Sequence, residues 1–161
     1  MNEQKFWEII ETAWAASPEL NSLRLETLVN NHPSQIEELN LALNDIITDN
    51  YCTILYTLEK EPFQKYVQIL EEKLHHIDRK EIHEYTDGSD DGFLYARCFI
   101  VGMGQQYYNM VDKDPSKATM DAEAEIFGFA AYDIYEEKFE EECTRNLLHN
   151  IETGSNPNGG W

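Results

Sequence analysis

Apolar side chains recur at intervals of three and four residues along most of the chain, which is the period of an amphipathic helix. The clearest stretch predicts a largely buried central helix at about residues 90–111. Its inward positions include Phe93, Leu94, Ile100 and Val101. No stretch shows the alternation of apolar and polar residues that is typical of a half-buried strand. The pattern therefore predicts an all-α fold.

Local signals predict where other helices begin. Residues 17–19 (Ser-Pro-Glu) supply an N-cap, a proline for the first helical position and an acid for the first turn. Ser34 with Glu37, and Asp78 with Glu81, have the spacing of capping boxes. Two of the expected helices therefore start near residues 34 and 78.

The last part of the chain predicts one long helix and a tail. Its apolar stripe indicates a helix from about Ser116 or Thr119 to about Leu148. Residues 153–161 are rich in glycine and asparagine and are expected to be flexible. The whole pattern predicts a compact single domain at residues 1–152, with six to eight helices bundled around the central one.

Charge is the strongest feature of the composition. The chain has 31 acidic and 12 basic residues, a net charge of −19. Such a surface repels nucleic acid and anionic membrane and attracts basic partners by long-range steering. The acidity is also explained if it only keeps the protein soluble. Composition alone leaves both interpretations open.

Three further features favour a cytoplasmic location. No apolar run approaches the roughly 18 residues of a membrane span. The first residues lack the basic and then apolar pattern of a signal peptide. Cys52, Cys98 and Cys143 lie far apart in apolar segments, as reduced thiols do. Neither a disulfide framework nor a metal site is expected from them.

An aspartate-rich turn precedes the central helix. Asp87, Ser89, Asp91 and Gly92 match the start of a calcium-binding loop, but Cys98 stands where that loop needs a bidentate glutamate. The simpler interpretation is a capping turn, whose carboxylates accept hydrogen bonds from the first helical N–H groups. No metal or other cofactor is predicted.

Arg97 is the most informative cation, because an arginine in a nearly apolar helix needs a partner. It lies one to two turns beyond Asp90, Asp91 and Phe93 and can share a face with some of them. A buried Arg–Asp pair is the structural interpretation. The functional alternative is a polar ligand pocket at Asp87–Arg97 that uses the two aspartates and the arginine.

A second acidic run lies near the predicted end of the last helix, at residues 136–142. Acids near a helix C-terminus oppose the helix dipole, which favours a role in binding a basic partner. A solvated face is the alternative. Nearby tyrosines are candidate anchors for such a partner. The predicted partner-binding residues are Tyr132, Tyr135, Glu136, Glu137, Glu140 and Glu141.

Four segments carry a family resemblance. They are Phe6-Trp7-Glu8-Ile9-Ile10-Glu11, the central Ser89-Asp90-Asp91-Gly92-Phe93-Leu94-Tyr95-Ala96-Arg97, Tyr107-Tyr108 and Asp114-Pro115. With them the chain resembles the bacterial family called domain of unknown function 4240 over nearly its whole length. The resemblance implies a cytoplasmic, mostly helical single domain and a kinship with the immunity proteins of bacterial toxin systems. Many members have Gly-Gly-Cys before the central motif, where this chain has Asp87-Gly88.

These observations predict a non-enzymatic binding protein. Its expected role is that of an immunity protein that neutralises a cognate, basic bacterial toxin by direct contact through an acidic surface. The alternative is a small-molecule-sensing or enzymatic domain with the polar pocket at Asp87–Arg97.

Overall fold

The computed structural model describes residues 1–30, 33–86, 90–143 and 151. Within these residues the chain is helical and has no strand, so the predicted all-α fold is confirmed. In the described part of the chain eight α-helices have eight residues or more, and α6 is a single turn. None of the described helices combines the length and apolar character that a membrane crossing requires.

In chain order the elements are α1 (Glu3–Ala15), α2 (Pro18–Asn30), α3 (Pro33–Ala42), a π-helical turn (Leu43–Ile47), α4 (Thr48–Leu55), α5 (Lys60–His76), α6 (Lys80–His83), α7 (Asp90–Gly102), α8 (Gln105–Lys113), a 3₁₀ turn (Pro115–Lys117) and α9 (Glu125–Phe139).

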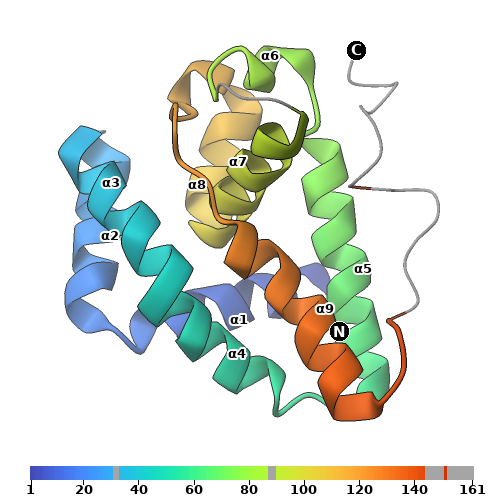
Figure 1. Cartoon of the computed structure of the whole chain (residues 1–161). Coiled ribbons are helices and arrows are strands. Elements are labelled where there is room, and N and C mark those ends of the chain that lie inside the picture. Colours follow the sequence, from blue (N-terminus) through green and yellow to red (C-terminus); the bar gives the residue numbers. More distant parts are fainter. Residues whose placement is uncertain (31–32, 87–89, 144–150, 152–161) are drawn as a thin grey trace.

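The helices share one hydrophobic core, and α7 lies at its centre. This helix packs against α5, α8 and α9, while α4 packs against α1 and α9. Helices α2 and α3 form a hairpin at one side of the molecule (Figure 1). The close approach of α7 and α9 depends on Gly128, because any Cβ at that position would collide with Cys98 Sγ.

The predicted central helix is correctly located but is divided in two. Helix α7 ends at Gly102, and α8 begins at Gln105 in a new direction. The break is at Gly104, whose φ is +90°. The apolar period continues through the break, because both helices bury a face in the same core. The hydrophobic pattern alone therefore cannot reveal the change of direction.

The predicted last helix is shorter than expected. It begins at Glu125 and ends at Phe139, where Glu140 adopts a left-handed conformation. The segment before it is a loop, and two hydrogen bonds fix its position. Glu123 N donates to Asn40 Oδ1 at 3.1 Å, and Asn44 Nδ2 donates to Glu123 O at 2.7 Å. The expected continuation through residue 148 and the predicted tail at 153–161 lie outside the described residues.

Candidate functional site

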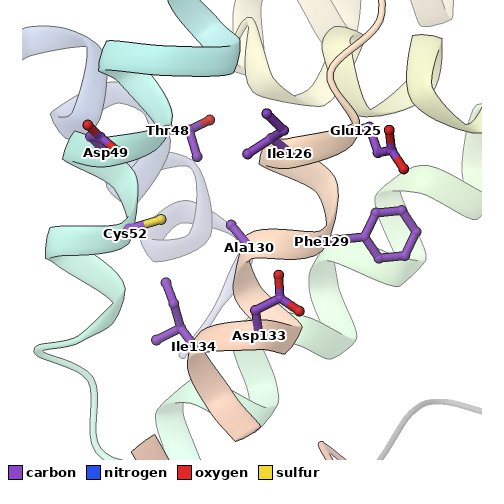
Figure 2. A pocket seen from close by; sticks show the side chains of 9 residues that line it. All are labelled: Thr48, Asp49, Cys52, Glu125, Ile126, Phe129, Ala130, Asp133 and Ile134. Atoms are coloured by element: carbon purple, nitrogen blue, oxygen red, sulfur yellow. The ribbon is translucent and has the colours of Figure 1, made fainter. Parts of the chain in front are cut away.

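A cavity of about 420 Å³ opens between α4 and α9 (Figure 2). We call it the α4–α9 groove. Its volume falls in the range of pockets that bind small ligands or inserted side chains. The groove is lined by Thr48, Asp49, Cys52, Glu125, Ile126, Phe129, Ala130, Asp133 and Ile134.

Helical spacing brings these side chains together. Thr48 and Cys52 are one turn apart on α4 and project toward α9 (Figure 2). On α9 the side chains of Ile126, Ala130 and Ile134 recur every fourth residue and point toward α4. Ala130 and Ile134 are buried, so the floor of the groove is largely apolar.

A π-helical turn leads into the α4 side of the groove. The Thr48 hydroxyl donates to Leu43 O, five residues earlier, at 2.5 Å. Its hydrogen is therefore used inside the turn and is not available to an occupant of the groove. Short π-helical turns occur frequently at functional sites.

The rim of the groove is acidic. Asp49, Glu125 and Asp133 are exposed at its edge, and none of the described residues that line it is a lysine, arginine or histidine. None of the three carboxylates forms an ion pair with a residue that the structure describes. The groove therefore combines an apolar floor with uncompensated negative charge, an arrangement that suits a cationic group with an apolar stem.

Two of these carboxylates act electrostatically on the thiol of Cys52. Burial raises the pKa of this half-buried thiol, and the negative charges of Asp49 and Asp133 raise it further. Asp49 belongs to α4 and Asp133 to α9, so both helices contribute to the negative charge that acts on this thiol. The raised pKa keeps the thiol protonated at neutral pH and makes it a poor nucleophile.

This arrangement gives a direct prediction. Asp49→Asn and Asp133→Asn are each expected to speed alkylation of Cys52 by iodoacetamide at pH about 8 by about twofold to fivefold, because a lower thiol pKa means more thiolate. The rate is measured by mass spectrometry of the peptide that contains Cys52. Glu136→Gln removes one charge from the same helix outside the groove and should leave the rate unchanged. Unchanged rates in both aspartate variants would contradict the contribution of these charges to the raised pKa of the thiol.

The predicted ion pair of Arg97 exists, but its partner is Asp78. Arg97 is 3% exposed, and its Nη1 lies 3.5 Å from Asp78 Oδ2. The same nitrogen donates to Leu74 O at 3.0 Å, and the guanidinium lies 4.8 Å from the centre of the Phe93 ring. Burial lowers the pKa of Arg97, and the charge of Asp78 opposes that shift.

Only part of the pocket predicted at Asp87–Arg97 falls on residues whose side chains the structure describes. Arg97 and Phe93 face the core. Asp90 and Asp91 are the first residues of α7. Asp87 and Ser89 lie outside the described residues. Asp78, which the capping-box spacing predicted as an N-cap, is buried two residues before the start of α6 instead.

Comparison with known families gives one match. The sequence profile of a family described as protein of unknown function (DUF4240) matches residues 53–141, more than half of the chain. The chain belongs to this family. No curated protein and no solved structure matches it.

The DUF4240 match includes all of the Asp78–Arg97 pair but only one side of the α4–α9 groove. The pair of Asp78 and Arg97 lies inside the matched segment, as does the α9 side of the groove. Asp49 and Cys52 lie just before its first residue. The α4 side of the groove is thus contributed mainly by residues outside the family match.

The two tyrosines predicted as partner anchors, Tyr132 and Tyr135, are buried in the structure, which corrects that prediction. Tyr132 is 4% exposed and Tyr135 is fully buried, so neither can contact a partner at the surface. Tyr132 donates its hydroxyl to the buried Glu71 at 3.1 Å, and Tyr135 donates to Glu141 Oε1 at 2.9 Å. Both rings lie on the inner face of α9 because aromatic residues on this helix help to form the core.

The predicted acidic run is only partly available to a partner. Glu137 accepts a short hydrogen bond from the Tyr56 hydroxyl, and Glu141 pairs with Lys60 at 2.7 Å. These contacts connect the end of α9 to the α4–α5 connection. Glu136 and Glu140 are exposed and form no ion pair with a described residue. Only these two remain from the predicted set as free surface carboxylates.

Proposed function

We propose that this DUF4240 member is a non-enzymatic binding protein for a basic protein partner, and that it acts as an immunity protein that neutralises a cognate bacterial toxin. The observation that carries the proposal is the α4–α9 groove, in which three uncompensated carboxylates surround an apolar floor. Such a surface is complementary to a basic segment with apolar neighbours.

The charge of the whole chain supports the same conclusion. A net charge of −19 gives a strong negative field that speeds encounter with a basic surface. The electrostatic field attracts a partner but provides no contact surface. The groove provides a place where a partner can bury apolar surface. Ile126 is 58% exposed at the groove and supplies part of that contact area. A toxin whose active site binds nucleic acid has the basic surface that this proposal requires.

Two local observations disfavour other functions for the residues concerned. The raised pKa of Cys52 argues against thiol catalysis in the groove. The contacts of Arg97 argue against a ligand pocket at Asp87–Arg97, because its Nε and Nη1 already bind partners in the core. The groove is the better supported site.

The test is coexpression with the protein encoded by the adjacent gene. We expect that protein to inhibit growth when expressed alone, growth to be restored by coexpression, and a complex to form on size-exclusion chromatography. The triple variant Asp49→Asn, Glu125→Gln, Asp133→Asn should weaken the complex at least about tenfold, since buried interfacial charge pairs contribute strongly to affinity. The double variant Glu136→Gln, Glu140→Gln removes charge elsewhere on the surface and should have a much smaller effect. Absence of toxicity and of a complex would refute the proposal.

A further inference from the structure

We propose that the outer side of α2 is a docking surface for a basic amphipathic helix of the protein partner. We call this surface the α2 outer face and define it by the side chains of Pro18, Ser22, Leu25 and Val29. The inference rests on the proposed function, because it adds a contact surface for the same basic partner and names the structure that the partner places there. It does not involve the α4–α9 groove.

Two buried side chains fix which sides of α2 face the rest of the molecule. Arg24 is buried and directs one side of the helix toward the core. Thr27 is also buried, and its Oγ1 lies 3.3 Å from Gln35 Oε1 on α3. Leu25 and Val29 lie two residues before and two residues after Thr27, a rotation of about 200° around a helix. Both therefore point away from α3, with which α2 forms the hairpin at one side of the molecule (Figure 1).

The α2 outer face carries exposed apolar side chains on a helix that is also apolar on its inner side. Leu25 is 47% exposed and Val29 is 79% exposed, and they are neighbours because they lie one turn apart. On the inner side, Leu20 and Leu23 pack against the core. A helix with apolar residues on more than one side is typical of a helix that is covered on those sides. Helix α2 packs against α1 and α3, and neither covers the outer face.

The spacing of this face fits a helix as its occupant. Pro18, Ser22, Leu25 and Val29 follow one another at intervals of four, three and four residues, the spacing of the a and d positions of a coiled coil. They span three turns, about 16 Å. The Ser22 hydroxyl donates to Pro18 O at 2.9 Å, so it does not require a polar partner from outside. A second helix with apolar residues at the same intervals can therefore lie along the face.

The charge around the α2 outer face selects a basic occupant. Glu19 and Glu26 are exposed on α2, and neither forms an ion pair with a described residue. In the sequence from Ser17 to Glu59, Arg24 is the only lysine or arginine, and it is buried. A symmetric contact with a second copy of this chain would bring these acids close to the same acids of the copy, which is unfavourable. Lysine or arginine beside the apolar residues of a partner helix would instead complement them.

The surface is tested first on the isolated full-length chain with two designed peptides. Each peptide is a helix of two heptads with leucine at the a and d positions, and the other positions are lysine in one peptide and glutamate in the other. The ¹⁵N-labelled protein is titrated with each. We expect saturating amide shift changes at Leu25, Glu26 and Val29 with the lysine peptide and none with the glutamate peptide. Saturation by the lysine peptide only at other residues would overturn the proposal.

Matched variants separate docking on α2 from general attraction to an acidic protein. Leu25→Gln with Val29→Gln should weaken binding of the lysine peptide at least about tenfold, because two apolar side chains lose their contact. Leu41→Gln changes a side chain on α3 that is 67% exposed and should leave the affinity unchanged. Glutamine is a good helix former and all three positions are exposed, so folding is expected to be retained, and the amide spectrum checks this. A wild-type dimer that the Leu25→Gln, Val29→Gln variant dissociates would assign the face to a second copy and overturn the proposal.

The same variants then separate failure of this surface from failure of the proposed function, in complexes with the protein encoded by the adjacent gene. A loss of affinity of at least about tenfold in the Leu25→Gln, Val29→Gln variant, with no loss in Leu41→Gln, supports docking on α2. If the double variant binds that partner as tightly as the wild type, the α2 outer face is wrong while the binding function stands. If the lysine peptide binds the face but the adjacent-gene protein forms no complex, the assignment to that partner is overturned together with the proposed function.

Discussion

Replacing Arg97 with alanine is expected to lower the free energy of unfolding by about 3 to 5 kcal/mol, the cost of removing one partner from a buried ion pair. The side chains of Arg97 and Asp78 are only 4% and 2% exposed. The truncation also removes the donor to Leu74 O and the cation above the Phe93 ring. Urea denaturation followed by circular dichroism measures the change. A loss below about 1 kcal/mol would be that of a surface pair and would contradict the burial.

A double variant separates the ion pair from the packing of the long side chain. Arg97→Met keeps most of the aliphatic volume but leaves Asp78 facing an apolar group, and Asp78→Leu leaves the guanidinium facing one. Because apolar side chains can replace a whole buried ion pair with little loss, the double variant should be more stable than either single variant. Additive losses would mean that the two residues stabilise the fold independently. Lys65→Ala, which breaks the exposed pair with Glu61, should cause no measurable change.

The fold could be predicted from sequence as far as it depends on local periodicity. The apolar positions of α7 recur at helical spacing, and their burial confirms the centre of the domain. Asp78 shows where this reasoning fails. Its spacing from Glu81 satisfies a capping rule, but the carboxylate is buried beside Arg97, which is contributed by a different helix. A local rule cannot register such a tertiary partner.

The α4–α9 groove could not be predicted from the sequence either, because it too depends on tertiary packing. Asp49 and Asp133 look like ordinary solvated acids along the sequence, and only the packing of α4 against α9 brings them to one cavity. The dense acidic run after Tyr135 attracted the sequence prediction instead. Charge density along a chain does not give availability, because Glu137 accepts a hydrogen bond from Tyr56 and Glu141 pairs with Lys60.

Gly104→Ala is the second substitution with a large expected effect on stability. Gly104 has φ +90° and ψ 173°, a region that is essentially restricted to glycine, so the backbone strain alone costs about 1 to 3 kcal/mol. The new Cβ would also collide with the Glu11 carboxylate and lie 2.6 Å from Arg24 Nη1. Denaturation in urea should show a lower midpoint with an unchanged slope.

The contacts around Gly104 explain why the strain matters to the whole domain. Arg24 Nη1 donates to Met103 O at 3.0 Å, and Glu11 Oε1 accepts from Gln105 N at 3.2 Å. Arg24 and Glu11 thereby satisfy backbone groups on both sides of the break between α7 and α8 and fix the direction of α8. In a Glu11→Ala background the collision with that carboxylate is gone but the backbone strain remains, so Gly104→Ala should still destabilise the protein. If its effect disappears in that background, the collision and not the backbone conformation makes glycine necessary.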